Sequence, residues 1–197
     1  MVSFSVVADR FFSARECLRV EYRIGRTLIP EEKIREKVKE LGARIREDYA
    51  GKQVVFVCVL KGAVVFFSDL IREIGPDVDV QLDFLAIASY GASTKSSGVV
   101  KIQKDLSTDI RGKHVVIVED ILDTGLSLNY IGELLRGRGP ASLEICVLLD
   151  KAERRTQPVD VKYSGFVIPD EFVIGYGLDY AGRFRQLPAI HVAEPAD

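Results

Sequence analysis

Cysteine and histidine are scarce in this chain of 197 residues, which holds three cysteines and two histidines. The odd number of cysteines and the lack of a Cys-x-x-Cys pair argue against a disulfide framework or a zinc ribbon, and His114 and His191 have no metal-ligand spacing. Cys58 and Cys146 lie inside apolar runs that are typical of core strands, whereas Cys17 lies in the N-terminal segment. We therefore expect reduced, inert thiols and a cytoplasmic protein.

Charge of one sign is not in excess either, because 27 basic residues stand against 29 acidic ones and the formal net charge is −2. This balance gives no electrostatic footprint for nucleic acid or an anionic membrane, so neither partner is expected, although basic residues cluster at 35–46 and 136–138. No apolar run reaches transmembrane length. Charged residues interrupt the first positions, so 1–26 lacks a secretory core and is expected to be a poorly ordered extension or an accessory surface element.

The chain also lacks internal repeats and linkers rich in proline, glycine or serine, which predicts one domain. Apolar residues at helical spacing predict a helix over 30–49, and strand and helix patterns then alternate. After Pro158 the helical signal is lost, and short apolar patches predict a strand-rich subregion. This order indicates an α/β fold with a central, mostly parallel sheet flanked by helices. The remaining expected elements are strands at 54–60, 80–88, 99–103, 115–118 and 143–149, helices at 63–74 and 127–136, a polar loop at 89–98, and strand patches at 159–167, 172–176 and 189–192.

The most informative stretch is 115–128, in which four β-branched apolar residues precede an acidic pair and a turn of small residues. The apolar run predicts a strand buried on both faces, which is typical of a parallel sheet. Glu119 and Asp120 stand where that strand is expected to end, and Asp123 opens a Thr-Gly-Leu-Ser turn. Helix capping explains Asp123 alone but not three carboxylates at one turn. The pattern predicts a site for a phosphate that also carries hydroxyls or a hard cation such as Mg²⁺.

This motif resembles the loop that binds phosphoribosyl pyrophosphate (PRPP) in type I phosphoribosyltransferases, and 28–192 is similar to the hypoxanthine-guanine members of that family. The resemblance implies the type I fold, with one domain over 27–197 and a core at about 50–150. It also implies a small strand-rich hood over the base, built from about 27–49 and 151–197. The implied reaction is purine salvage, in which hypoxanthine or guanine displaces pyrophosphate from PRPP and gives IMP or GMP.

The resemblance assigns roles to the acidic pair and to the turn. Glu119 and Asp120 match the carboxylates that lie against the ribose hydroxyls and help to hold Mg²⁺, the expected cofactor. Asp123 matches the general base or acid toward the purine N7, a role that requires hydrogen-bond reach of the base. Some relatives carry lysine where Leu126 stands, so the phosphate here must depend more on backbone N–H groups. The loop expected to bind the 5′-phosphate consists of Asp123, Thr124, Gly125, Leu126 and Ser127.

The expected pyrophosphate and lid contacts rest on shorter patterns. Lys61 and Gly62 follow a predicted strand and match the tripeptide that contacts pyrophosphate in the family, although an ordinary strand-to-helix turn gives the same pattern. Arg185 matches an arginine that contacts pyrophosphate, where a planar guanidinium suits phosphate oxygens. Ser89 and Tyr90 match the start of a flexible loop that closes over the site and excludes water.

The residues expected to read the purine lie in the last third of the chain. Lys151 directly follows a predicted strand, and its ammonium can donate to O6, which favours 6-oxopurines over adenine. Phe172 resembles the aromatic that stacks on the base, although core packing is the usual position of such a phenylalanine. Val173 resembles the residue whose backbone contacts the 2-position of the ring. Asp179 matches an acid at the second Mg²⁺ and base site.

Other activities remain open from the sequence. The spacing of Lys151 and Phe172 argues against orotate and adenine, whereas a xanthine-preferring enzyme is harder to exclude. A protein of a different class, an RNA-binding regulator with the PRPP fold, would keep the loop but should present a coherent basic face. A PRPP synthetase would need a longer chain with an ATP site. The expected partners are PRPP, hypoxanthine and guanine, and the family resemblance implies a homodimer or a homotetramer.

Overall fold

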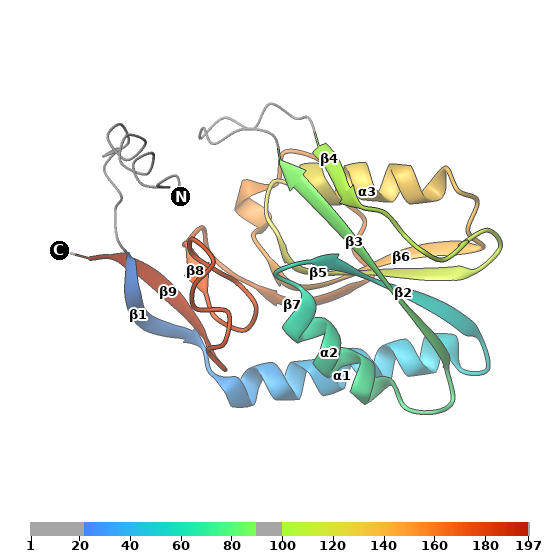
Figure 1. Ribbon diagram of the computed structural model, residues 1–197. Helices are drawn as coiled ribbons and strands as arrows, with labels where there is room; N and C mark the ends of the chain where they lie inside the picture. The colour runs from blue at the N-terminus through green and yellow to red at the C-terminus, as the bar shows by residue number, and fades with distance from the viewer. Residues whose placement is uncertain (1–21, 90–99, 197) are drawn as a thin grey trace, which may run out of the picture.

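The main sheet has six strands in the order β4-β3-β2-β5-β6-β7 (Figure 1). The computed structural model describes residues 22–89 and 100–196. All neighbouring strands of this sheet run parallel except β3 and β4, which pair antiparallel at one edge. The expected α/β class with a mostly parallel sheet is therefore confirmed. The strands are β2 (Gln53–Leu60), β3 (Asp79–Ser89), β4 (Val100–Lys104), β5 (His114–Leu122), β6 (Ser142–Asp150) and β7 (Tyr163–Val167).

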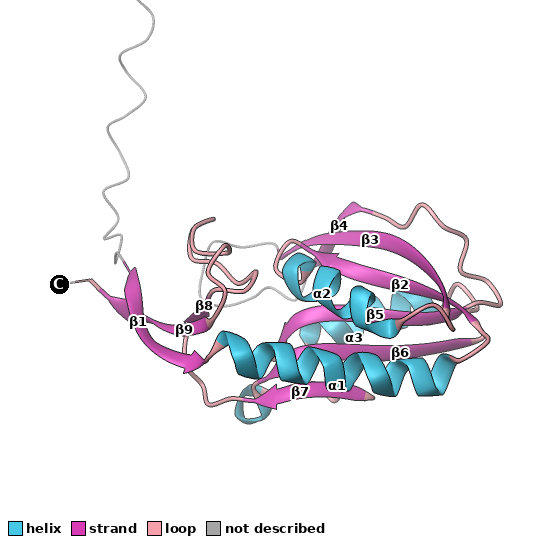
Figure 2. Cartoon of the chain, turned by 90° about the horizontal axis from the view of Figure 1, so that it is seen from below, coloured by secondary structure: helices cyan, strands magenta, loops and turns pink. Residues whose placement is uncertain are grey.

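Helices cover both faces of this sheet (Figure 2). Alternate residues of a strand point to opposite faces, so the apolar runs of β2, β5 and β6 supply two cores. One core joins these strands to α1 and α2, and the other joins them to α3. The central strands are consequently buried on both sides, as their sequences predict. The helices are α1 (Glu31–Tyr49), α2 (Val64–Ile74) and α3 (Leu126–Arg136), with one 3-10 turn, η1 (Ala152–Arg154).

A second, antiparallel sheet lies beside the main one and has the order β1-β9-β8 (Figure 1). It consists of β1 (Tyr22–Ile29), β8 (Val173–Ile174) and β9 (Ile190–Pro195). Tyr22 pairs with Pro195, and Ile24 pairs with Ala193. Segments from the two ends of the described chain therefore form one small sheet. Residues 22–26 were expected in an N-terminal extension, but they belong to β1 because β9 supplies a pairing edge; residues 1–21 lie outside the described part.

Two boundaries differ from the sequence expectations. Strand β5 does not end before the acidic pair but continues to Leu122, because β6 runs beside it and pairs Glu119 with Val147 and Leu122 with Asp150. The patch at 159–167 was expected in a strand-rich subregion, but its strand β7 pairs with β6 in the main sheet.

The division into core and hood stays a prediction, and two contacts bear on its boundary. The buried face of α1, which includes Ile34, Val38 and Leu41, belongs to the same core as α2 and the main sheet. Strand β7 also joins that sheet. Most of 30–49 and the strand at 163–167 therefore pack with the core, although both fall in ranges that the sequence assigned to the hood.

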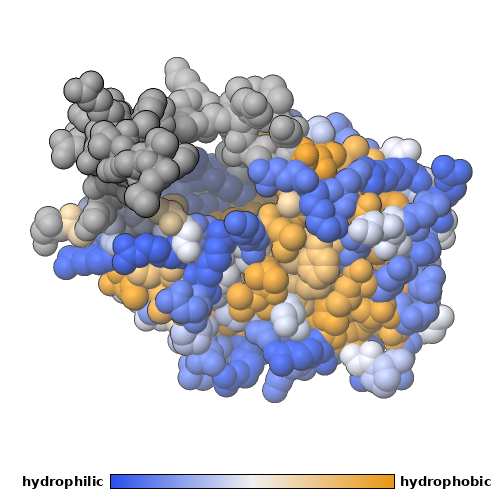
Figure 3. All heavy atoms as spheres, in the orientation of Figure 1, coloured by the Kyte–Doolittle hydropathy of each residue, from blue (hydrophilic) through white to orange (hydrophobic). Residues whose placement is uncertain are grey.

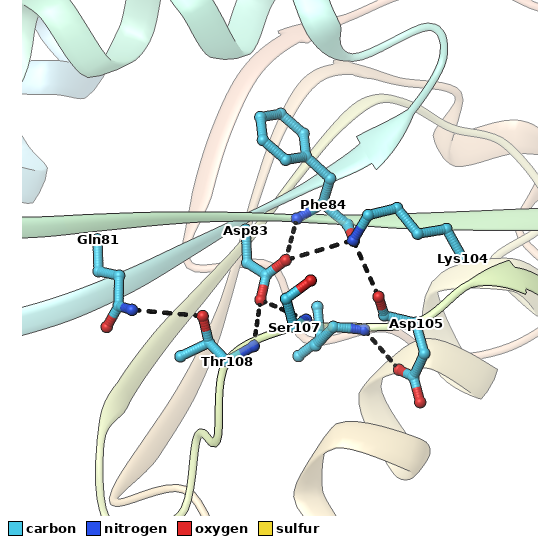
Figure 4. Close-up of polar contacts among 8 residues, drawn as sticks. Gln81, Asp83, Phe84, Lys104, Asp105, Ser107 and Thr108 are labelled. Atoms are coloured by element: carbon cyan, nitrogen blue, oxygen red, sulfur yellow. Dashed lines mark hydrogen bonds and ion pairs between the residues drawn. The ribbon is translucent and has the colours of Figure 1, made fainter.

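A buried aspartate holds the chain that follows β4 (Figure 4). Asp83 on β3 is only 4% exposed, and one carboxylate oxygen accepts the backbone N–H groups of Ser107 at 2.8 Å and Thr108 at 2.7 Å. The Nζ of Lys104 lies 3.5 Å from its other oxygen, which also accepts the Phe84 N–H at 2.7 Å. Asp83 thus fixes the turn after β4 against the neighbouring strand.

Across the ranges 22–89 and 100–196, no helix combines the length and the apolar character that crossing a membrane requires.

Candidate active site

Two neighbouring cavities lie at the carboxyl ends of β2 and β5. The first, of about 280 Å³, is lined by Glu119 and the turn that begins at Asp123. The second, of about 350 Å³, is lined by Asp120 and by the residues expected to read the purine. Their linings share Lys61, Gly62, Ile121 and Asp123. A larger cavity of about 690 Å³ lies between α1, α2 and 185–188, and Arg185 is the only expected site residue in its lining. The two smaller cavities, which the other expected residues line, are therefore the candidate active site.

The acidic pair lies where the two cavities meet. Burial, followed by the charge of Asp120, raises the pKa of Glu119 well above its usual range. Burial also raises the pKa of Asp120, which is 7% exposed. Two adjacent carboxylates in such a place are costly as bare anions. Hydroxyl donors or a cation would relieve that cost, so the pair suits a polyhydroxylated ligand or a hard metal ion.

Gly62, which follows β2, lies against the Asp120 carboxylate. A Cβ added to Gly62 would lie 1.7 Å from Asp120 Oδ2, so no other residue fits without displacing the carboxylate. The peptide between Leu60 and Lys61 is cis, and Lys61 is exposed beside the cavities. The segment expected to contact pyrophosphate is therefore packed directly on the acidic pair.

The turn after β5 presents the N-terminus of α3. Gly125 has φ +87°, a conformation that glycine adopts readily, and an added Cβ would lie 2.6 Å from the Gln157 carbonyl oxygen. Helix α3 has no side-chain cap and no acidic residue in its first turn, so its N-terminus suits an anion. Thr124, Gly125 and Ser127 line the first cavity, whereas the Leu126 side chain does not.

Asp123 occupies the boundary between the cavities and faces a cation that sequence reasoning missed. Arg154 Nε lies 2.8 Å from Asp123 Oδ1. The pair is not aligned as a hydrogen bond, and this buried Oδ1 accepts none from the described residues. The Asp123 side chain as a whole is 43% exposed, so the rest of its carboxylate faces the cavities, as a general base toward a purine nitrogen requires.

Lys151 lies at the end of β6, as the sequence predicted, and is 6% exposed. Its N–H donates to the Leu122 carbonyl at 2.9 Å, which ties it to the end of β5. Its Nζ lies 3.4 Å from Asp170 Oδ1, another residue that the sequence did not reveal. Lys151 thus lines the second cavity, as Asp123 does.

Phe172 is 46% exposed and lines the second cavity, which distinguishes it from a phenylalanine of the core. Its ring centroid lies 5.4 Å from that of Tyr22 and 6.0 Å from that of Tyr180, and the two tyrosines contact one another. Val173 is buried on β8 and pairs with Val192. Through Tyr22, strand β1 therefore contacts the Phe172 and Tyr180 rings.

Asp179 and Arg185 also line the second cavity. Arg185 donates to the Gly177 carbonyl at 2.6 Å and pairs with Asp179 Oδ1 at 2.5 Å. Arg183, two positions before Arg185, is exposed, and its guanidinium lies over the Phe184 ring. The cavity thus brings Arg185 rather than Arg183 to the site, and its carboxylate partner is Asp179.

The lid, the metal ligands and the cysteines complete the set of sequence expectations. Ser89 is the last residue of β3, and Tyr90 lies outside the described residues, so their assignment to a lid stays a prediction. Within the described ranges, no group of three or more His, Cys, Asp or Glu side chains is placed to hold a metal ion. Cys58 and Cys146 are buried, as expected, and burial raises the pKa of Cys58 to about 12.

The fold and the PRPP-type turn define a class of nucleotide-forming transferases. The chain belongs to the phosphoribosyltransferase family, because the family model described as "Phosphoribosyl transferase domain" matches residues 28–181. Its relatives narrow the class further. The hypoxanthine-guanine phosphoribosyltransferase of Bacillus subtilis (strain 168) is 48% identical over 177 residues, which is 90% of this chain and 97% of that protein.

A second relative and a solved structure give the same family. The hypoxanthine-guanine phosphoribosyltransferase of Dictyostelium discoideum is 52% identical over 163 residues, which is 82% of this chain and 91% of the relative. A crystal structure of a hypoxanthine phosphoribosyltransferase from Staphylococcus aureus superimposes with a TM-score of 0.83 at 48% identity, covering 87% of this chain and 92% of that one. The similarity extends over most of both chains in each case.

Proposed function

We propose that this protein is a purine salvage enzyme that converts hypoxanthine or guanine plus PRPP into IMP or GMP plus pyrophosphate. The observation that carries the proposal is the pair of cavities that share Asp123. One cavity offers the turn and helix N-terminus suited to a ribose phosphate, and the other offers Lys151 and Phe172 for a 6-oxopurine. The shared wall is then the place where sugar and base react.

In the proposed reaction a bond forms between a purine nitrogen and C1 of the ribose while the bond from C1 to pyrophosphate breaks. Asp123 exchanges a proton with N7 through the exposed part of its carboxylate, since the side chain is 43% exposed although Oδ1 is buried against Arg154. Glu119 and Asp120 lie against the ribose hydroxyls and oppose the positive charge that develops on the sugar. Lys151 donates to O6 and orients the base, and Phe172 stacks on it.

The remaining contacts in this proposal concern pyrophosphate and its cation. Lys61, Gly62 and Arg185 would bind the pyrophosphate oxygens. Glu119 and Asp120 fit Mg²⁺ as a buried acidic pair, because this ion is commonly held by one or two carboxylates together with substrate oxygens and water. When bound, the ion would neutralise charge on the leaving group. The metal role proposed for Asp179 requires it to share its carboxylate with Arg185, its present partner.

We also propose a homodimer or a homotetramer in the cytoplasm. Val64 at the start of α2 and Leu82 on β3 are 40% and 44% exposed. Figure 3 shows apolar side chains gathered over this part of the molecule. A second copy would cover such a patch. Sedimentation of the protein at several concentrations tests this, and a monomer throughout would contradict it.

The direct test of the site is Asp123→Asn. Asparagine keeps the shape of the side chain but cannot take the proton, so we expect turnover with hypoxanthine to fall at least about tenfold while PRPP binding is retained. Turnover is measured by pyrophosphate release and PRPP binding by calorimetry. Wild-type turnover in this variant would remove Asp123 from its proposed role.

A further inference from the structure

Four charged side chains form a continuous chain along the purine side of the site. Arg154 Nε lies 2.8 Å from Asp123 Oδ1, and Arg154 Nη1 lies 3.3 Å from Asp170 Oδ1. That same oxygen of Asp170 lies 3.4 Å from Lys151 Nζ. Arg154 and Asp170 therefore connect Asp123 with Lys151, the two residues proposed to read N7 and O6 of the base.

The backbone holds Arg154 in this place. Its N–H donates to the Lys151 carbonyl at 3.0 Å within the 3-10 turn η1. Just beyond that turn, the N–H groups of Thr156 and Gln157 donate to the Thr124 carbonyl at 3.0 and 3.1 Å. The segment 151–157 is thus tied to the phosphate turn at one end and to β5 at the other, so the guanidinium is carried to Asp123 by a fixed piece of chain.

The geometry of the Asp123 contact is informative in itself. Arg154 approaches the Asp123 carboxylate at Oδ1, an oxygen that the protein buries. The Asp123 side chain as a whole is 43% exposed, so its accessible part lies away from that oxygen. The contact can therefore hold the carboxylate by its buried oxygen and leave the exposed part of the carboxylate for the base.

Asp170 makes the arrangement more than one surface ion pair. Burial opposes the charged form of Asp170, but hydrogen bonds from Arg154 and then Lys151 outweigh it and lower its pKa. One carboxylate thus bridges two cations, and a change in either cation is felt by the other. An isolated exposed pair would contribute little, whereas a network of this kind couples the positions of its members.

We propose that Arg154 is a positioning residue that fixes the carboxylate of Asp123 and, through Asp170, sets the placement of the Lys151 ammonium. The inference rests on the proposed roles of Asp123 and Lys151. Its consequence is that the groups facing N7 and O6 are adjusted together, so that one purine orientation satisfies both. Loss of Arg154 should then impair the use of the purine and leave the use of PRPP intact.

The experiment compares Arg154→Gln, Arg154→Lys, Asp170→Asn and the Arg154→Gln/Asp170→Asn double variant in steady-state kinetics. For Arg154→Gln we expect kcat/KM for hypoxanthine to fall about tenfold, with KM for PRPP within about twofold of wild type. Arg154→Lys should recover part of the loss, because an ammonium restores the charge but not the span to both carboxylates. The double variant should lose less than the two single losses multiplied together.

A matched control is Arg46→Gln, which removes an arginine from an ion pair on α1, where Nε lies 2.7 Å from Asp77 Oδ2, outside both site cavities. Its kinetics should match wild type. Wild-type kinetics for Arg154→Gln, an equal loss for PRPP, or multiplicative losses in the double variant would each overturn the inference. Asp123→Asn separates the two proposals: normal turnover there contradicts the site assignment, whereas slow turnover with a normal Arg154→Gln contradicts only the role of Arg154.

Discussion

The close contact between Gly62 and Asp120 shows how a single missing side chain shapes the site. Asp120 is buried against the backbone that follows β2, at a point where a Cβ on Gly62 would lie 1.7 Å from its Oδ2. The acidic residue of one strand and the pyrophosphate segment of the next are consequently parts of one packed unit. The position of the carboxylate depends on this glycine as much as on its own strand.

We predict that Gly62→Ala raises KM for PRPP at least about tenfold, because Asp120 or the Lys61 segment must move to admit the methyl group. Stability should fall by about 1–3 kcal/mol, as measured by urea unfolding. Gly137→Ala is the matched control, since its nearest neighbour would be the Leu134 carbonyl oxygen at 3.4 Å, an ordinary contact. An unchanged KM for PRPP in Gly62→Ala would show that Asp120 is not held by this contact.

Individual site residues could be read from the sequence to different extents. Asp123 and Lys151 follow predicted apolar strands at the edge where sheets of this class bind ligands, and the family resemblance supplied the role expected of Asp123. Arg154 and Asp170 gave no such signal, since each is one charged residue among several on irregular chain. Their proximity depends on how 151–157 folds back onto Thr124, which no local pattern encodes. Tyr22 was missed for the same reason, because β9 decides where it lies.

Among the elements, β4 depends on a contact with its neighbour for its position. Strand β4 forms the antiparallel edge of the main sheet, and backbone N–H groups of the turn after it donate hydrogen bonds to the buried carboxylate of Asp83 (Figure 4). Burial alone would raise the pKa of Asp83, but hydrogen bonds from the N–H groups of Phe84, Thr108 and Ser107 outweigh it and lower the pKa. A lowered pKa in the folded state means that the ionised carboxylate stabilises the fold.

We predict that Asp83→Asn destabilises the protein by about 1–3 kcal/mol at neutral pH, because an amide has only one oxygen to accept these N–H groups. The stabilisation from Asp83 is present above the unfolded-state pKa near 4 and is lost as the pH falls through the lower folded-state value. The difference between wild type and variant should therefore shrink below about pH 4. Urea unfolding across a pH series measures this.

Asp109→Asn is the control for that series, because Asp109 is exposed and accepts one N–H, from Arg111. It should change stability little at any pH. A constant difference between Asp83→Asn and wild type down to pH 3 would contradict the assigned role of the carboxylate.

The elements of the main sheet were predictable because strong periodic patterns marked them. The helix expected at 30–49 is α1, and the strands expected at 54–60 and 143–149 are β2 and β6. The strand expected to stop at the acidic pair was placed wrongly, since pairing with β6 extends it to Leu122. Pairing between distant segments is what short patches cannot reveal, so the membership of β7 in the main sheet also required the structure.

At the scale of the whole molecule, the chain combines a PRPP-type turn on the main sheet with a cavity wall that we propose faces the purine and to which the second sheet contributes. Val173 on β8 and Phe172 beside it come from the small sheet, whereas Glu119 and Asp120 come from the large one. Asp120 and Phe172 line the same cavity, which is where we propose that the reaction takes place. We therefore propose a specificity for 6-oxopurines that depends on this second wall and on Lys151.

The most direct test of that claim is pyrophosphate release from PRPP and Mg²⁺ with hypoxanthine, guanine, xanthine or adenine. We predict release with hypoxanthine and guanine and little with adenine, because the Lys151 ammonium can donate to O6 but not to an amino group. Xanthine as the sole good substrate would support the xanthine-preferring alternative. Release with adenine alone would contradict the role of Lys151. If no base gave release and the protein retained RNA on a filter, the proposed transferase activity would be contradicted and the RNA-binding regulator supported.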